Sequence, residues 1–326
     1  MIISKTPFRI SFFGGGTDYP AWYMKHCGAV LSTTINKYCY ITCRYLPPFF
    51  KHKYRIVHSR IENINNVNEI EHPAVRGVLQ FLNIKEGLAI HHEGDLPARS
   101  GIGSSSSFTV GLLHSLYALK ELMPTKMKLA KESIHIEQDI LKENVGSQDQ
   151  VEVAYGGLNK ISFNTDGEFQ VEPIILNKER LQLFQDHLLF YFTGFSRNAS
   201  EIAKEQIKNT ENKKKELNIM HQMVQEGVQI LTGNSDITEF GKLLNESWKL
   251  KRSLTNKIST PDIDNLYEIA MRSGAVGGKL LGAGGGGFIL FFASPSAHKK
   301  IKEKLKNILN VSFKFENYGS QIVFYA

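Results

Sequence analysis

Glycine is concentrated in three short segments of the 326-residue chain, at residues 14–16, 95–107 and 277–287. Glycine loses more conformational entropy on folding than any other residue, so an ordered glycine cluster is unfavourable by itself. Backbone packed tightly against a ligand or a neighbouring element would offset that loss. The segments are therefore candidate ligand-contacting turns. Floppy connections are the alternative, which the apolar sequence on both sides of the third segment disfavours.

Outside these segments the composition is that of an ordinary globular protein. The hydrophobic fraction is 42% and the charged fraction 22%, which excludes a disordered chain, a collagen-like fibre and a disulfide scaffold. The length allows one large domain or two ordinary ones. No apolar run reaches the roughly 20 residues of a membrane-crossing helix, and we see no secretory leader. The three cysteines cannot all pair with one another and lack metal-ligand spacing, so they are expected to be reduced thiols. We therefore expect a cytoplasmic protein.

Positive charge is concentrated at the start of the chain. Residues 1–60 carry nine Lys or Arg and one acid, Asp18, while the whole chain has a net charge of +7. This asymmetry indicates an anionic partner, namely a nucleic acid, an anionic lipid or a small phosphorylated ligand. Nucleic-acid binding needs basic residues interleaved with exposed aromatics. Tyr38, Tyr40 and Tyr45 come near that pattern, but they alternate with apolar positions, which favours core or cleft placement.

The pattern of apolar residues predicts an α+β fold with a strand-rich N-terminal half and a helix-rich C-terminal half. The expected elements include strands over residues 2–13 (broken at Pro7) and 30–45, and helices over residues 105–122, 126–143 and 200–231.

The segment at residues 95–107 leads into a predicted helix and ends in four serines. Glycines let backbone N–H groups approach an anion, and the helix start adds unpaired N–H groups and the positive end of the helix dipole. Serines there can cap the helix, bind phosphate oxygens or ligate Mg²⁺. The spacing matches neither a Walker A loop nor a dinucleotide fingerprint. Phosphate binding and an ordinary glycine–serine turn both stay open.

Four charged side chains are candidate site residues. Arg9 lies in an apolar strand, where a buried guanidinium needs a partner; an edge strand facing water is the alternative. Asp18 could accept hydrogen bonds from sugar hydroxyls, or form an Asx-turn or helix cap. Glu137 falls late in a predicted helix, and Asp149 follows a Gly-Ser-Gln turn. One carboxylate could hold a metal while the other acts as a base, although helix carboxylates are usually solvated.

Together these elements resemble the superfamily of galactokinase, homoserine kinase, mevalonate kinase and phosphomevalonate kinase (GHMP kinases). The likeness covers nearly the whole chain, through motifs at residues 7–19, 96–107 and 279–287. It implies two lobes with the active site between them. The N-terminal lobe would resemble domain 2 of ribosomal protein S5, and the C-terminal lobe would be ferredoxin-like. We place these lobes at residues 1–180 and 181–326.

The resemblance also implies a role for each candidate. Asp149 matches the catalytic aspartate, and Arg9 matches the arginine that galactokinases place beside it. Glu137 and Ser105 match the residues that bind Mg²⁺, and Asp18 matches the residue that holds sugar hydroxyls. The residues expected to contact the phosphates of ATP are Gly101, Gly103, Ser104, Ser105 and Ser106.

One departure from galactokinases concerns the substrate. Gly15 and Gly16 stand where galactokinases carry Glu-His, which leaves space and removes an anion. Both glycines are expected to face the substrate, as are Gly284 and Gly285. Arg197 is a candidate contact for a second phosphate, with a surface role equally open. This glycine form is similar to that of the D-glycero-D-manno-heptose 7-phosphate kinases, which phosphorylate the anomeric hydroxyl and yield the 1,7-bisphosphate.

The resemblance implies an ATP- and Mg²⁺-dependent kinase for the anomeric hydroxyl of a sugar phosphate, heptose 7-phosphate above all, serving nucleotide-heptose synthesis. Kinases of unphosphorylated fucose, galactose or hexosamine are the alternative within this class. A basic nucleic-acid-binding protein is the alternative from another class. We expect a small sugar or sugar phosphate as partner, neither nucleic acid nor membrane, and a monomer or homodimer.

Overall fold

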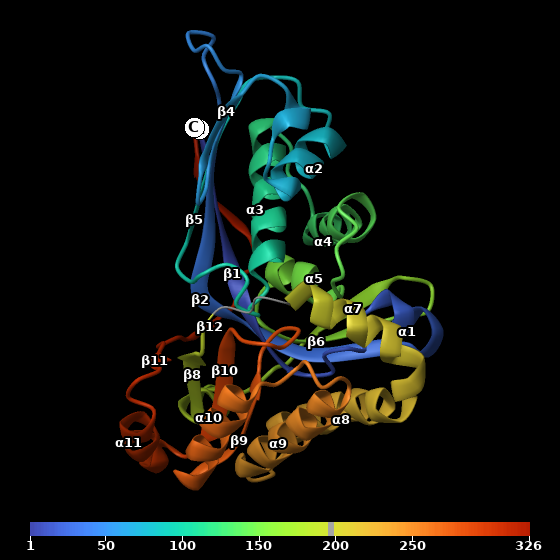
Figure 1. Ribbon diagram of the computed structural model, residues 1–326, viewed down its shortest axis with the longest axis vertical. Helices are drawn as coiled ribbons and strands as arrows, with labels where there is room; N and C mark the ends of the chain where they lie inside the picture. The colour runs from blue at the N-terminus through green and yellow to red at the C-terminus, as the bar shows by residue number, and fades with distance from the viewer. Residues whose placement is uncertain (195–198) are drawn as a thin grey trace.

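The computed structural model describes residues 1–194 and 199–326 (Figure 1). In these residues the chain forms a large sheet and a smaller sheet with helices packed against both, which confirms the predicted α+β class. Among the described helices, none is long and apolar enough to cross a bilayer.

The large sheet is built around β2 (Gly28–Tyr45), whose 18 residues pair with several neighbours. Its strand order is β13-β1-β2-β5-β3-β4, while β6 pairs with β2 and β7, and β12 also pairs with β2. All of these pairs are antiparallel except β3 with β5. The other strands are β1 (Ile2–Phe13), β3 (Tyr54–Val57), β4 (Ile61–Ile64), β5 (Leu88–Gly94), β6 (Leu158–Phe163), β7 (Phe169–Pro173), β12 (Phe315–Glu316) and β13 (Gln321–Tyr325).

The expected break at Pro7 is wrong, because β1 runs through it. The register of β1 against β2 shifts between Pro7 and Phe8, which is a bulge. Proline has no N–H to donate, and a bulge is a position where a strand tolerates that loss. The strand therefore continues to Phe13 and carries the first glycine turn at its end.

The smaller sheet has the order β11-β8-β10-β9 and is antiparallel. Its strands are β8 (Leu188–Phe192), β9 (Ala275–Leu280), β10 (Phe288–Ala293) and β11 (Leu309–Asn310). After β11 the chain returns to the large sheet, where β12 pairs with β2 and β13 pairs with β1. The last strands therefore share a sheet with the start of the chain, although the predicted division assigned them to the C-terminal lobe.

The helices lie in two groups (Figure 1). In the N-terminal part, α2, α3 and α4 stand on one face of the large sheet. In the C-terminal part, α9 and α10 pack against the smaller sheet, whereas α8 packs against β1 and β2 of the large sheet. The helix bounds are α1 (Pro20–His26), α2 (Pro73–Phe81), α3 (Ser104–Leu119), α4 (Lys126–His135), α5 (Gln148–Tyr155), α6 (Lys178–Asp186), α7 (Ala199–Asn209), α8 (Lys214–Thr232), α9 (Thr238–Ser253), α10 (Pro261–Arg272) and α11 (Pro295–Lys304).

An aromatic cluster fixes the end of β1 against the helices and strands of the C-terminal part. The ring of Phe12 lies 5.2 Å from that of Phe184, and the ring of Phe13 lies 5.0 Å from that of Phe240. Phe292 of β10 joins the same cluster. All five rings are buried. Residues 14–16 follow this cluster directly, so the first glycine turn begins next to side chains that are fixed by packing.

A buried carboxylate crosslinks three elements beneath the site. Glu152 of α5 accepts hydrogen bonds from Ser32 Oγ of β2 at 2.7 Å and from Asn159 Nδ2 of β6 at 3.2 Å. Burial raises the pKa of Glu152 to about 8, against an ordinary value of 4.5. Between pH 4.5 and 8 the folded protein therefore keeps a proton on Glu152, whereas the unfolded chain releases it.

We predict that substitution Glu152→Gln flattens the dependence of stability on pH. Between pH 4.5 and 8 the native state binds the extra proton, so the wild type loses up to about 1.4 kcal/mol of stability per pH unit as the pH rises. Glutamine carries no such proton and should be the more stable variant above pH 8. Urea unfolding across this range measures the difference. The exposed Glu172→Gln is the control, and equal slopes in both variants would contradict the prediction.

Candidate active site

A two-point ion pair forms the centre of the candidate site. Arg9 of β1 donates from Nε to Asp149 Oδ1 at 2.6 Å and from Nη2 to Asp149 Oδ2 at 2.8 Å. Its third nitrogen, Nη1, donates to the backbone oxygen of Gly101 at 2.7 Å. Arg9 is 2% exposed, whereas the Asp149 side chain is 22% exposed. The guanidinium is thus fixed, and the carboxylate at the start of α5 keeps access to a ligand.

The predicted phosphate loop lies directly on this pair. The backbone N–H of Arg9 donates to Ile102 O at 3.0 Å. Gly101 and Gly103 have φ angles of +81° and +73°, a region that favours glycine. An ideal Cβ on Gly103 would lie 3.1 Å from Arg9 Cγ and 3.3 Å from Asp149 Oδ2. The loop therefore approaches the ion pair as closely as a backbone can.

The first turn of α3 presents its N–H groups without a side-chain cap. Of its serines, Ser104 accepts a hydrogen bond from the Arg99 N–H at 3.1 Å, and Ser105 is exposed. The Ser107 hydroxyl donates to the backbone oxygens of Pro7 and Gly103. An uncapped helix N-terminus behind a glycine loop is suited to bind an anion.

Glu137 lies beneath this helix start, in a π turn (Ile136–Ile140) that follows α4. Its Oε2 accepts hydrogen bonds from Ser106 Oγ at 2.9 Å and Gln150 Nε2 at 2.6 Å. Its Oε1 is buried and has no hydrogen-bond partner within the described part of the chain. Burial raises the pKa of Glu137 to about 8. A buried carboxylate oxygen left unpaired is an available ligand for a cation.

In the structure Glu137 is hydrogen-bonded to Ser106, whereas Ser105, which the resemblance implies as a Mg²⁺ ligand, makes no such bond, and its metal role stays a prediction. Gly103 takes the left-handed conformation immediately before α3 and so sets where the first helical turn begins. As a result Ser106 is buried beside the carboxylate, and Ser105 is exposed.

Asp18 joins the first glycine turn to the turn before α5. The carboxylate is buried, and its Oδ1 accepts from the Gly16 N–H at 2.8 Å. Its backbone oxygen accepts from the Ser147 N–H at 2.9 Å. An ideal Cβ on Gly146 would lie 1.8 Å from Asp18 Oδ2, so no other residue fits there. Burial raises the pKa of Asp18.

The two glycines before Asp18 have different surroundings. An ideal Cβ on Gly16 would lie 3.2 Å from Leu217 Cδ2, so Gly16 is packed against α8. An ideal Cβ on Gly15 would meet nothing closer than Lys251 Nζ, at 3.8 Å. A side chain at Gly15 would therefore meet ordinary van der Waals contacts, whereas one at Gly16 would be crowded, and a substrate contact at either glycine stays a prediction.

Two buried lysines that the sequence did not indicate lie near Asp18 and Arg9. Lys251 of α9 donates to Gly282 O at 2.5 Å, and Lys279 of β9 donates to Phe12 O at 2.8 Å. Burial lowers the pKa of Lys251 to about 8 and that of Lys279 well below its usual range. The available signal is spacing, since Lys251 follows Leu244 and Trp248 on the apolar side of a helix.

The third glycine segment packs its backbone against the phosphate loop. An ideal Cβ on Gly282 would lie 2.5 Å from Gly101 Cα, and one on Gly287 would lie 2.3 Å from Ser100 O. Gly284 packs against the backbone of Ile258 in the same way. The expectation of tightly packed backbone therefore holds, with the chain itself as the neighbour.

Two of the predicted substrate contacts lie against the chain's own backbone. Gly284 abuts Ile258, and the Gly285 N–H donates to Ile258 O at 2.9 Å. Their contact with a substrate stays a prediction. Arg197 lies outside the described residues.

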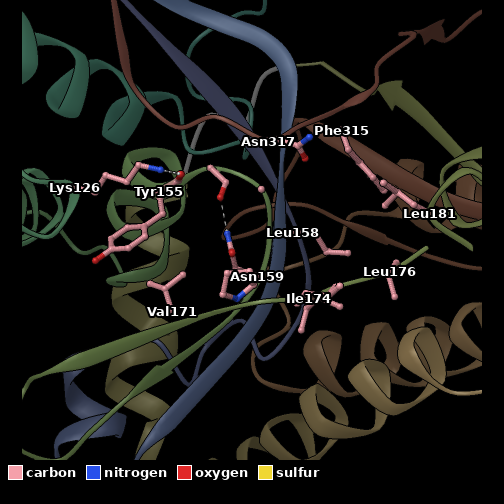
Figure 2. Close-up of a pocket in the computed structure, with 14 residues that line it drawn as sticks. Lys126, Tyr155, Leu158, Asn159, Val171, Ile174, Leu176, Leu181, Phe315 and Asn317 are labelled. Atoms are coloured by element: carbon pink, nitrogen blue, oxygen red, sulfur yellow. Dashed lines mark hydrogen bonds between the residues drawn. The ribbon is translucent and has the colours of Figure 1, made fainter. Parts of the chain in front are cut away.

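A hollow of about 490 Å³ lies apart from this site, between the end of α5, β6 and the segment after β7 (Figure 2). Apolar side chains such as Val171 and Ile174 line it, and Lys126 Nζ donates across its edge to Tyr155 O at 2.7 Å. None of the predicted site residues lines this hollow.

Two family models match the chain. The model described as "GHMP kinases N terminal domain" matches residues 68–157, and "GHMP kinases C terminal" matches residues 228–310. Together they cover more than half of the chain, which belongs to the GHMP kinases. It is therefore an ATP-dependent phosphotransferase with an alcohol group as acceptor.

Similar proteins include several sugar kinases. A D-glycero-alpha-D-manno-heptose 7-phosphate kinase of Campylobacter jejuni is 26% identical over 94% of this chain and 93% of its own. A galactokinase of Pyrococcus furiosus is 27% identical over 93% and 92%. Among solved structures, a D-glycero-D-manno-heptose 1-phosphate kinase from Bacteroides thetaiotaomicron has a TM-score of 0.80, at 22% identity and full coverage of both chains. This likeness confirms the two-lobed GHMP fold.

We predict that Gly101→Ala removes most activity and lowers stability. A methyl group there would lie 2.4 Å from Leu281 O, in addition to the strain of a φ of +81°. Gly167→Ala is the matched control, because its φ is +86° and its nearest neighbour would be 3.8 Å away. The strain alone costs about 1–2 kcal/mol. Thermal unfolding and ADP release measure both variants, and equal effects would refute the contact between the two glycine segments.

Proposed function

We propose that this kinase transfers the γ-phosphoryl group of ATP to the anomeric hydroxyl of a sugar phosphate, of the type of D-glycero-D-manno-heptose 7-phosphate. The observation that carries the proposal is the partly exposed Asp149 carboxylate, held by Arg9 beside the uncapped start of α3. In this proposal the Asp149 carboxylate is the proton acceptor and the N-terminus of α3 binds the phosphates. The name of the Campylobacter jejuni relative, a heptose 7-phosphate kinase, supports the sugar phosphate as acceptor.

In the proposed reaction the acceptor hydroxyl forms a bond to the γ-phosphorus while the bond to the bridging oxygen of ADP breaks. Asp149 accepts the hydroxyl proton. Arg9 holds Asp149 in place through two hydrogen bonds. The N–H groups of residues 101–106 bind the phosphates of ATP, and Asp18 orients the sugar.

Mg²⁺ fits this site at Glu137, because the carboxylate has a buried oxygen without a partner and Ser106 Oγ lies beside it. We therefore propose Glu137 and Ser106 as its protein ligands. When bound, the ion would neutralise charge on the phosphates of ATP. Deprotonation of Glu137, whose pKa burial raises to about 8, accompanies metal binding.

We predict that Asp149→Asn lowers kcat by about 10²–10⁴-fold, the usual contribution of a positioned base. The amide keeps an acceptor for Arg9 but cannot take the proton. ATP binding, measured by calorimetry with a non-hydrolysable analogue, should stay within a few-fold of wild type. Asp262→Asn is the control, since Asp262 also lies in the first turn of a helix and is exposed. Near-normal turnover by the Asp149 variant would exclude Asp149 as the base.

A panel of acceptors tests the substrate. We expect ADP release with heptose 7-phosphate to exceed that with the unphosphorylated heptose by about tenfold or more in kcat/KM, the value of a hydrogen bond to a charged group. The panel also includes hexose 6-phosphates, fucose, galactose and N-acetylhexosamines. Turnover confined to unphosphorylated sugars would overturn the sugar-phosphate proposal while leaving the kinase assignment intact.

A further inference from the structure

Arg99, in the segment that leads into α3, has a left-handed backbone. Its φ is +59°, a conformation that is unfavourable for a bulky side chain. Among the described residues, the other non-glycine residues with a positive φ follow the ends of α1, α2, α3 and the π turn after α4, where a left-handed residue is usual: Cys27, Asn83, Glu121 and Lys142. Arg99 precedes a helix, so helix termination does not explain its conformation.

Contacts on both sides of Arg99 impose this conformation. Its N–H donates to the Oγ of Ser104, the first residue of α3, at 3.1 Å. The next residue, Ser100, is buried, and its Oγ donates to Pro97 O at 2.6 Å. The backbone oxygen of Ser100 accepts from the Phe288 N–H at 3.0 Å. A glycine at position 99 would adopt this backbone with less strain. The chain therefore carries an arginine here at a cost in stability, which indicates a role for its side chain.

The guanidinium of Arg99 is available to a ligand. The side chain is exposed and makes no hydrogen bond or ion pair with the residues that the structure describes. Its charge acts on the carboxylate of Glu143, and the charge of Glu143 acts on Glu137. The Glu143 N–H also donates to Glu137 O at 2.9 Å. Arg99 therefore lies in the neighbourhood of Glu137, beside the first turn of α3.

The start of α3 is an unfavourable place for a cation in the free protein. A helix N-terminus carries partial positive charge and stabilises anions, whereas cations are favoured at the C-terminus. The first turn of α3 has no acidic residue and no side-chain cap. A bound phosphate would accept hydrogen bonds from the helix N–H groups and from the guanidinium together. The other arginine at this loop, Arg9, already directs its donors to Asp149 and Gly101.

We propose that Arg99 is a nucleotide-binding residue, whose guanidinium donates hydrogen bonds to the phosphates of ATP at the start of α3. The inference rests on the proposed function, which places those phosphates at residues 101–106. Arg99 adds a cation to a site otherwise built from backbone N–H groups and serine hydroxyls. Because its hydrogen bonds are charge-assisted, they strengthen binding of the nucleotide and leave binding of the sugar unchanged.

Two substitutions separate the charge of Arg99 from the strain of its backbone. Arg99→Gln removes the charge and keeps a side chain on the left-handed backbone, whereas Arg99→Gly removes both. We expect each variant to raise the Kd for a non-hydrolysable ATP analogue about tenfold or more, the value of a hydrogen bond to a charged group. Only Arg99→Gly should also raise the midpoint of thermal unfolding, by about 1–3 °C, because it relieves the strain. Calorimetry and thermal unfolding without ligand measure the two effects.

Glu121→Gly is the matched control. Glu121 has a φ of +60° and is exposed at the opposite end of α3. Its replacement should raise the midpoint of thermal unfolding as Arg99→Gly does, and leave the Kd for the analogue within about twofold of wild type. Arg99→Lys, which keeps the charge, should recover part of the affinity that Arg99→Gln loses.

The outcomes separate this inference from the proposed function. A Kd for the analogue within about twofold of wild type in both Arg99→Gln and Arg99→Gly would overturn the inference. A rise in Kd confined to Arg99→Gly would also overturn it, because the shape of the loop and not the charge would then hold the nucleotide. If the analogue binds in an Arg99-dependent way but no sugar phosphate is turned over, the proposed acceptor fails and this inference stands.

Discussion

The ion pair between Arg9 and Asp149 depends on backbone contacts that only glycine permits. The third nitrogen of Arg9 binds the oxygen of Gly101, and Gly101 lies against Gly282 and Leu281 with no room for a side chain. The glycine segment of the C-terminal part thus supports the phosphate loop, the loop supports Arg9, and Arg9 holds Asp149. Because each link is a hydrogen bond or a van der Waals contact, small displacements anywhere in this series reach the carboxylate.

The site is also distinguished by charge that the protein does not neutralise internally. Asp18, Glu137, Lys251 and Lys279 are all buried, and burial shifts the pKa of each toward the neutral form. Such groups destabilise the free protein, since their desolvation is incompletely compensated. Ligands that carry phosphate and a divalent cation would supply the missing partners.

The sequence allowed the α+β class and the family to be predicted, because the motifs depend on residues with few substitutes. The sequence shows glycine at 101 and 103, where the φ angles are positive, and an arginine at position 9 inside an apolar strand, where it is buried. The hydrogen bond of Glu137 to Ser106, and not to Ser105, could not be predicted, since it depends on the residue at which α3 begins. The sequence does not indicate that Lys251 lies beside the first glycine turn. It is more than 200 residues after Gly15 in an amphipathic helix, and only the folded chain brings the two together.

The return of the chain to its first sheet has a mechanical consequence. The chain leaves the large sheet after β7 and re-enters it at β12, so the smaller sheet and its helices are an insertion held by two covalent connections. A break in either connection alone would therefore leave the smaller sheet covalently attached to the large one, and a circular permutant could be opened at either connection without dividing either sheet.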